Sequence, residues 1–468
     1  MDTGTAPVAT PTPRPTALGL SRWVLFGLSL GYFMVLLDTT IVTVALPAIG
    51  DSFTGGLSSL QWVVNGYTTT FAALLLTAGW LSDRFGGRRI FLIGLTSFGV
   101  LSAVSAASAD LAMLVVLRLL LGAAGALLLP TSLAIITNVY TVPAQRAKAV
   151  GNWAAITGFA LVCGPVLGGL LVDTVGWRAI FLINAPLAVV SYVITARTAP
   201  ETALKPRSGL DIPGQLSAIV GLAALVYGLV EGPAHGWGSG VIVTAFAVAA
   251  ATVTAFLIAE TRAGDAGMLP LRVFSSRRFS AAVLGGLLAN FGLSGVLFVL
   301  SLFFQDSRGY SPLQAGLMFL PLTLPTAFNP MFTGRLVGRI GARTPATVGF
   351  ILMSIGTLIQ APFTGNSAGA VAASVVGLLC FGFGMSFALP SLVATVANSV
   401  PVQLAGIGAG ALNSGRQVGA SLGVAALGVV LAQFATSAHG TQWALVVAGV
   451  VLIVGAFVVA AGLRAEPT

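Results

Sequence analysis

The chain has 468 residues, of which 56% are hydrophobic and only 7% are charged, and its mean hydropathy is +0.97. So few charged side chains cannot cover the water-facing surface of a soluble protein of this length. The composition therefore excludes soluble enzymes, nucleic-acid-binding proteins and disordered proteins, and it indicates an integral membrane protein in contact with the lipid bilayer. The 58 glycines and 23 prolines fit this class, because neighbouring membrane helices can satisfy the backbone groups that these residues leave unpaired.

Few residue types that carry chemistry in water are present. The only lysines, Lys148 and Lys205, do not follow a glycine as the lysine of a phosphate-binding Walker loop does, so ATP hydrolysis is not predicted. Both histidines, His235 and His439, are predicted in short outer loops without cysteine or acidic residues at metal-ligand spacing. Glu231 is predicted to be an outer-loop carboxylate or, alternatively, an aid to proton entry. The sequence thus predicts no metal, no cofactor and no enzymatic activity.

The chain divides into apolar segments long enough to span a membrane. A helix needs about 20 apolar residues to cross about 30 Å of hydrocarbon. Fourteen segments of this kind are predicted, at 23–44, 61–81, 90–107, 111–136, 150–172, 179–196, 214–230, 241–259, 281–304, 313–332, 346–361, 368–393, 407–431 and 443–463. Residues 1–17, rich in proline, threonine and alanine, are predicted to form a disordered cytoplasmic tail.

The basic residues indicate how these segments are oriented. When the connecting segments are placed alternately inside and outside, starting inside, 18 of the 22 basic residues fall on the inner side. Arg178 and Arg308 fall outside, and Arg118 and Arg416 lie within spans. Inner loops of membrane proteins are enriched in lysine and arginine, so both termini are predicted to be cytoplasmic and the protein to lie in the cytoplasmic (inner) membrane. This asymmetry also explains the net charge of +9 without nucleic acid.

An internal repeat relates the first six spans to the last six. Gly79–Arg88 and Gly334–Arg343 share Gly, Leu, Arg, Gly and Arg at an offset of 255 residues. The repeat predicts an all-α, 6 + 2 + 6 arrangement in which residues 18–200 and 266–468 form two six-helix bundles and residues 201–265 form a two-helix insertion. Two parallel six-helix halves describe the major facilitator fold, with the substrate path between them. We expect a monomer.

Four motifs resemble those of the 14-helix drug:proton antiporters of the major facilitator superfamily, and the resemblance covers residues 23–463. They are LDTTIVTVALP (37–47), GWLSDRFGGRR (79–89), LRLLLGAAGA (117–126) and the set Gly164, Pro165, Gly168 and Gly169 followed by WRAIFLINAP (177–186). The resemblance implies proton-coupled export of lipophilic small molecules, such as drugs or antibiotics, driven by the proton gradient. The fifth-span glycines are the part of the pattern associated with exporters rather than importers.

Asp38 and Arg118 are predicted to form the proton-coupling site. Asp38 lies about 24 Å of helix beyond Arg22 and is the only acidic residue within the predicted spans. Burial disfavours the charged form of a carboxyl group, which suits a group that must gain and lose a proton. Arg118 lies within about 6 Å of Asp38 in depth, so ion pairing is feasible. The alternatives are a helix-packing hydrogen bond between Asp38 and Thr39 or a neighbouring backbone group, and an Arg118 that only anchors backbone carbonyls.

The loop after the second span is predicted to be a conformational latch, formed by Gly79, Asp83, Arg84, Gly86 and Arg88. The glycines would allow close helix approach and a tight turn, and Asp83 would pair with arginine side chains or cap a helix. The alternative is a topology signal, which explains the arginines but not Asp83.

The fifth span is predicted to be a helix pivot, because Gly164, Pro165, Gly168 and Gly169 allow a bent helix in close contact with its neighbours. Close packing without motion is the alternative. In the thirteenth span, Arg416 and Asn413 are predicted to line the substrate cavity; alternatively, Arg416 extends towards polar groups of neighbouring helices.

Three functions are consistent with this pattern. The first is a proton-driven exporter of lipophilic molecules, and the alternative on the same fold is a proton-coupled uptake symporter. The third is a non-transporting membrane scaffold, which the buried charges disfavour because they would be needlessly costly. Few polar groups are available to hold a hydrophilic nutrient, which disfavours uptake.

Overall fold

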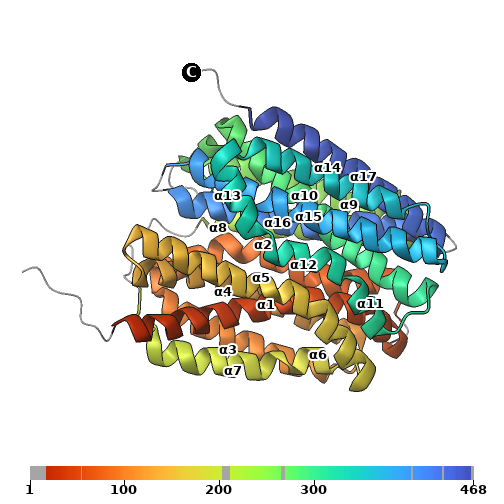
Figure 1. Cartoon of the computed structure of the whole chain (residues 1–468), viewed down its shortest axis with the longest axis horizontal. Helices are drawn as coiled ribbons and strands as arrows, with labels where there is room; N and C mark the ends of the chain where they lie inside the picture. The colour runs from red at the N-terminus through yellow and green to blue at the C-terminus, as the bar shows by residue number, and fades with distance from the viewer. Residues whose placement is uncertain are drawn as a thin grey trace, which may run out of the picture.

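The computed structural model describes residues 17–53, 55–202, 211–264, 269–401, 404–434 and 437–464. Almost all of the predicted tail, and Lys205 with Arg207, lie outside these residues. The described part of the chain is helical, without a strand, and its long helices run roughly side by side along the long axis of the molecule (Figure 1). We call the end that carries the α2–α3 loop the inner end and the end that carries the α1–α2 loop the outer end.

The first seven helices lie together in the red-to-yellow part of Figure 1. Asp110 caps α4 by accepting a hydrogen bond from the Met113 backbone N–H at 2.7 Å, and Pro143 occupies the first turn of α5. The helices are α1 (Ala17–Phe53), α2 (Leu57–Phe85), α3 (Gly87–Ala106), α4 (Leu111–Val139), α5 (Pro143–Thr174), α6 (Ala179–Leu182) and α7 (Asn184–Thr198).

The remaining helices form a pair and a second group. Helices α8 (Ile212–His235) and α9 (Gly240–Ala263) pack on each other, and α8 also contacts α2 and α16. The second group lies in the green-to-blue part of Figure 1. It comprises the 3-10 helix η2 (Leu271–Ser275), α10 (Arg277–Leu302), the π-helical turn η3 (Phe303–Ser307), α11 (Pro312–Met318), α12 (Leu320–Phe328), α13 (Pro330–Ile340), α14 (Arg343–Gln360), α15 (Ala368–Ser399), α16 (Ala405–Ala432) and α17 (Ser437–Gly462).

Eleven helices of the described chain are long and apolar enough to cross a membrane. Three predicted spans do not meet that measure. Helix α2 carries buried polar side chains, the chain over 312–340 is divided into the short helices α11, α12 and α13, and α14 has only 18 residues and begins with Arg343. Each of these three segments is nevertheless helical and packed among the others.

The helices extend beyond the predicted spans, which ended at charged residues. Asp38 is the only acidic residue within the predicted spans but not within the longer helices of membrane length. Near the ends of these helices lie further acidic residues: Asp51, Asp173, Glu231, Glu260 and Asp306. The prediction of an outer-loop Glu231 is wrong, because this residue lies in α8 and accepts a hydrogen bond from the Trp62 indole at 2.8 Å.

The two histidines also lie in helices rather than in loops. His235 is the last residue of α8 and His439 belongs to the first turn of α17, and both are exposed. The connections at these points are short. Polar residues that the sequence pattern assigned to loops therefore lie in the terminal turns of the helices.

The internal repeat is visible in the packing. A Cβ atom on Gly122 of α4 would collide with the backbone of Tyr67 on α2, and one on Gly382 of α15 would collide with the backbone of Leu322 on α12. Tyr67 and Leu322 are themselves separated by the 255-residue offset of the loop motif. Both groups of helices therefore use a glycine at the same crossing to bring two backbones together.

Candidate functional site

Asp38 and Arg118 form a buried ion pair between α1 and α4. The Nη1 atom of Arg118 donates to Oδ2 of Asp38, and the side chains are 1% and 0% exposed, respectively. Nε of Arg118 also donates to the backbone oxygen of Val63 on α2 at 2.9 Å, and the guanidinium lies 4.4 Å from the centre of the Tyr67 ring. The positive charge is therefore held by a carboxylate, a carbonyl and an aromatic face.

A second layer of hydrogen bonds orients the carboxylate. Nδ2 of Asn184 donates to Oδ1 of Asp38 at 3.2 Å and to Oγ of Ser102 at 3.0 Å. Ser102 in turn donates to the backbone oxygen of Phe181 at 2.8 Å. Asn184 opens α7 directly after the short break that separates it from α6. Sequence reasoning did not single out Asn184 or Ser102; the only signal for Asn184 was its place in the WRAIFLINAP motif.

These contacts decide between the readings left open by the sequence. The Thr39 hydroxyl donates to the backbone oxygen of Val35 at 3.0 Å, so it is not the partner of Asp38. Arg118 does bind a backbone carbonyl, but it also pairs with Asp38. The two residues predicted for proton coupling are thus in direct contact.

The α2–α3 loop packs against the segment that follows α7. Gly86 has a φ of 93°, a conformation that side chains with a Cβ rarely adopt, and Glu201 lies beside it. The backbone N–H of Arg88 donates to Oε1 of Glu201 at 3.0 Å, and that of Gly87 donates to Oγ1 of Thr202 at 2.6 Å. The loop is therefore fixed within the first group of helices.

The other residues of the predicted latch, Asp83, Arg84 and Gly79, differ in their exposure and packing. Asp83 is half-buried and Arg84 is exposed at the end of α2. A Cβ atom on Gly79 would have its nearest neighbour, on Pro130, 4.0 Å away. The expectation that Gly79 is needed for close helix approach is therefore wrong, since α4 leaves room for a larger residue.

Arg88 has a counterpart in the repeat. Its Nη2 atom donates to the backbone oxygen of Ala196 near the end of α7. The repeat-equivalent Arg343 donates through Nε to the backbone oxygen of Ala460 near the end of α17, at 2.8 Å. We call these two contacts the inner anchors. Each ties the start of the third long helix of a group to the end of its last helix.

The glycines of α5 face two different neighbours. Added Cβ atoms would lie 2.8 Å from Cβ of Thr40 for Gly164 and 2.9 Å from Cγ1 of Ile41 for Gly168, so these glycines allow α5 to pack on α1. A Cβ atom on Gly169 would instead lie 2.6 Å from Cα of Leu313 on α11.

Pro165 lies on the side of α5 that contacts α11. A Cβ atom on Gly316 of α11 would lie 2.9 Å from the carbonyl carbon of Pro165. The helix runs without interruption through Pro165. The motif therefore joins α5 both to its own group of helices and, at the outer end, to the other group.

Further contacts close this outer seam, by which we mean the contacts of α1 and α5 with α10, η3 and α11. Asp173 accepts hydrogen bonds from the Ser311 hydroxyl at 2.8 Å and the Leu313 backbone N–H at 3.0 Å. Ser301 and Gln305 donate to backbone oxygens of α1, those of Thr43 and Val44, at 2.7 and 3.0 Å. The seam was not predicted, because it joins residues more than 130 positions apart.

Arg416 and Asn413 are brought together on α16. Nη1 of Arg416 donates to Oδ1 of Asn413 at 3.0 Å, and Nε donates to Oδ1 of Asn290 on α10 at 3.3 Å. The guanidinium also interacts electrostatically with Tyr32 of α1. Arg416 therefore lies where the two groups of helices face each other, and its nearest partners are neutral amides.

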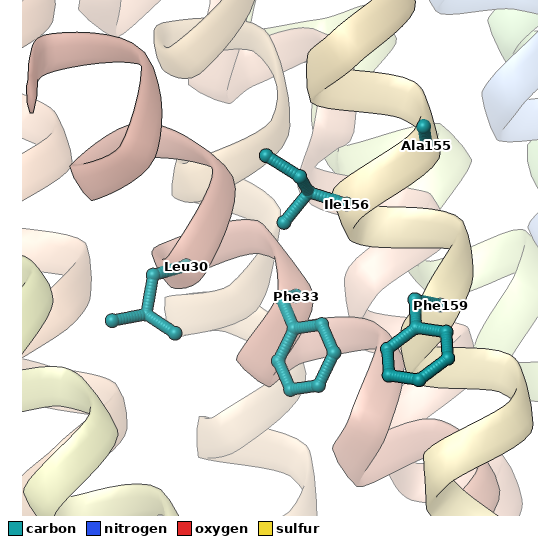
Figure 2. Close-up of a pocket in the computed structure, with 5 residues that line it drawn as sticks. All are labelled: Leu30, Phe33, Ala155, Ile156 and Phe159. Carbon is teal, nitrogen blue, oxygen red and sulfur yellow. The ribbon is translucent and has the colours of Figure 1, made fainter. Parts of the chain in front are cut away.

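An apolar crevice of about 390 Å³ separates the inner halves of α1 and α5. Figure 2 shows Leu30 and Phe33 on α1 opposite Ala155, Ile156 and Phe159 on α5. All five lining side chains are apolar. Within the described residues there is no cluster of His, Cys, Asp or Glu that could hold a metal ion.

Comparisons with known proteins agree with this architecture. The chain is 34% identical over 428 residues to the methylenomycin A resistance protein of Streptomyces coelicolor, which covers 92% of this chain and 89% of the relative. It is 35% identical over 408 residues to the multidrug resistance protein Stp of Mycobacterium tuberculosis, with 87% and 75% covered. It is 33% identical over 435 residues to the tetracenomycin C resistance and export protein of Streptomyces glaucescens, with 92% and 80% covered.

A solved structure shares the fold. The crystal structure of a bacterial homolog of the human lysosomal transporter Spinster, in an inward-facing and unoccupied conformation, superposes with a TM-score of 0.68 at 19% identity, covering 96% of this chain and 98% of the other. The model of the Major Facilitator Superfamily matches residues 28–424. With a helical bundle of this kind and relatives along nearly its whole length, the chain belongs to the Major Facilitator Superfamily, a family of multi-pass membrane transporters and not of enzymes.

Proposed function

We propose that this protein exports lipophilic small molecules, such as drugs or antibiotics, across the cytoplasmic membrane in exchange for protons. The observation that carries the proposal is the Asp38–Arg118 pair, an ionisable pair fully buried at mid-helix in a membrane bundle. Buried charges are costly in a membrane and mark ion pathways. The names of the relatives, which describe antibiotic resistance and export, support the direction of transport.

In the proposed cycle, Asp38 takes a proton from the outer side and releases it to the cytoplasm. Protonation removes the negative charge that faces Arg118 and so weakens the pair that holds α1 to α4. Loss of the proton restores the pair, with Asn184 still in place to orient the carboxylate. Each protonation state thus favours a different arrangement of the helices, which is what coupling requires.

The membrane arrangement that we propose has 14 crossings, in which α2, the α11–α13 segment and α14 join the eleven clearly apolar helices. Both termini are cytoplasmic. Residues 18–200 and 266–468 form the two halves and residues 201–265 the two-helix insertion. The protein functions as a monomer, and the proton gradient is its only source of energy, without a cofactor.

The remaining motif residues have conformational roles in this proposal. Asp83, Arg84 and Arg88 stabilise one state at the inner end, and the positive φ of Gly86 provides the turn that places them there. Gly164, Pro165, Gly168 and Gly169 allow α5 to pivot between α1 and α11. Arg416 and Asn413 line the substrate cavity between the halves.

Transport into inside-out membrane vesicles tests the proposal. Respiration acidifies the interior of such vesicles, so an exporter should accumulate 2-naphthoate or its neutral analogue 2-naphthamide there and lose the accumulation when an ionophore collapses the proton gradient. The control is the Asp38→Asn variant, matched for protein amount. Gradient-driven accumulation in both proteins, or in neither, would contradict the proposal. Accumulation in right-side-out vesicles with an acidic exterior would indicate the uptake symporter instead.

A further inference from the structure

Arg416 is a cation near the middle of α16, and its polar contacts in the described part of the chain are neutral. Its aliphatic stem packs on α10, where a Cβ atom on Gly286 would lie 3.2 Å from Cγ of Arg416. Its polar contacts are the amide oxygens of Asn413 and Asn290, at 3.0 and 3.3 Å. Within the described residues, no carboxylate forms an ion pair with it.

Arg118 shows how this fold accommodates a fully buried cation. That guanidinium is paired with Asp38, and the pair is closed to solvent. An unpaired guanidinium in a membrane bundle is expensive unless a counter-charge reaches it for at least part of the time. Arg416 is only half-buried, so an incoming ligand can reach it.

Tyr32 and Trp153 belong to the first group of helices and pack on each other. Tyr32 of α1 interacts electrostatically with Arg416, and no direct hydrogen bond joins them in the described part of the chain. Tyr32 stacks on Trp153 of α5, with ring centres 5.2 Å apart and planes inclined by 11°. The Trp153 side chain is 8% exposed, and its Nε1–H is buried without an acceptor in the described structure.

The polar contacts of Arg416 are therefore neutral amide oxygens, and none of those described is an anion. An indole N–H has no acceptor capacity, and a buried donor without a partner is costly. Amide oxygens satisfy two N–H groups of the guanidinium but leave its charge uncompensated. A monoanionic group bound at Arg416 would compensate this charge.

We propose that Arg416, with Asn413, Tyr32 and Trp153, forms a recognition site for the anionic group of the substrate, and that the preferred substrates are lipophilic organic acids bound as carboxylates or phenolates. This inference rests on the proposed export function and narrows its substrate class. Export of an anion is also favoured by a membrane potential that is negative inside.

A matched pair of ligands tests the proposal. The purified full-length protein is titrated calorimetrically with 2-naphthoate and with 2-naphthamide, which share the aromatic body and differ in charge. A charge-assisted hydrogen bond is about twice as strong as a neutral one, so we expect naphthoate to bind at least about tenfold more tightly. Equal affinities, or no binding of naphthoate, would overturn the proposal.

Substitutions then locate the site. Arg416→Gln should reduce the naphthoate-to-naphthamide affinity ratio to about one while changing the amide affinity less than about twofold, and Arg416→Lys should keep part of the preference. Trp153→Phe removes the indole N–H with little change of shape and should weaken naphthoate binding about threefold, because one donor is lost. Arg262→Gln, which removes an exposed arginine at the end of α9, is the charge-matched control and should bind like the wild type.

Transport separates this inference from the proposed function. In proteoliposomes with a proton gradient, export of the neutral amide without any preference for naphthoate would overturn the inference and leave proton-driven export standing. The opposite result is also informative. If naphthoate binds selectively and this binding depends on Arg416, but the proton gradient drives transport of neither ligand, the anion site would be supported and the export function contradicted. Preservation of the naphthoate preference in Arg416→Gln would overturn the assignment of the site.

Discussion

Asp173, in the last turns of α5, accepts a hydrogen bond from the backbone N–H of Leu313 at 3.0 Å, at the start of α11. A carboxylate is favoured at this end of a helix, where N–H groups are unpaired and the helix dipole is positive. Because α5 and α11 belong to different groups of helices, the contact holds the outer seam closed.

The first prediction concerns this contact. Asp173→Asn keeps the shape of the side chain but loses the charge, so the population with an open outer end should rise about threefold to tenfold. Spin labels at Thr174 and Ser367, both exposed at the outer end, should report a larger share of long distances. Asp110→Asn, at an exposed acid that caps α4 and can still cap it as asparagine, is the matched control. An unchanged distance distribution in Asp173→Asn would contradict this role.

The second prediction compares two glycines of the same helix. A Cβ atom on Gly169 would lie 2.6 Å from Cα of Leu313, whereas one on Gly158 would meet nothing within 4 Å. Gly169→Ala should therefore prevent full closure of the outer seam. If the clash disfavours the closed state by about 1.4 kcal/mol, the population of that state falls about tenfold, and proton-driven export should fall by about the same factor. Gly158→Ala should transport normally. Equal effects of the two substitutions would mean that helix propensity, not the seam, is responsible.

The third prediction is a double-mutant cycle at the buried pair. Asp38→Asn leaves a buried guanidinium without its counter-charge, which should cost about 3 to 5 kcal/mol of stability, and Arg118→Gln leaves the carboxylate alone at a similar cost. The double variant should regain most of its thermal stability but not its proton-driven export. Asp38→Glu should retain partial export. The test measures the melting temperature of each detergent-solubilised variant and its proton-driven export in vesicles. Proton-driven export by the double variant would show that Asp38 is not the coupling residue.

The fourth prediction addresses the latch. Asp83→Asn should reduce transport while ligand affinity and protein level stay nearly unchanged, because it alters an equilibrium between states and not the cavity. If the interaction of Asp83 favours one conformational state by about 1 to 3 kcal/mol, its loss would change the population ratio of the two states by about fivefold to 150-fold. Transport kinetics and calorimetric binding are measured on the same preparation. Wild-type turnover in Asp83→Asn would leave this loop with a topological role only.

The fifth prediction is the membrane topology. In a background in which Cys163 and Cys380 are replaced, single cysteines at Ser239 and Ser367 should react with an impermeant maleimide in intact cells, whereas one at Ser275 should not. All three residues lie outside the membrane-length helices in the structure, and Ser275 and Ser367 are exposed. Labelling of Ser275 from outside would contradict the 14-crossing arrangement.

Sequence reasoning succeeded where regular geometry sufficed. Counting residues along a helix placed Asp38 and Arg118 at a common depth, and the structure shows them in contact. Gly86 was expected to permit a tight turn, and both Gly86 and Gly341, its equivalent at the 255-residue offset, have positive φ angles, 93° and 78°. Both inferences use only the rise of a helix or the likeness of two segments.

What sequence reasoning missed depends on long-range packing. Asn184 contacts Asp38 only because α6 and α7 return beside α1 after 146 residues. The extent of the helices was also missed, because hydropathy falls at charged residues while the helix continues, as it does past Glu260 in α9. Gly79 was misjudged because the room beside it depends on how α2 and α4 pack at Pro130, which the sequence does not reveal.

The inner anchors have a consequence for synthesis of the protein. Arg88 and its acceptor Ala196 are separated by 108 residues, and Arg343 and Ala460 by 117. Each contact is complete only when the last helix of its own group has entered the membrane, and neither needs any residue of the other group. A growing chain that has reached α8 therefore already contains both partners of the first inner anchor, so this contact can form before any residue of the second group is synthesised.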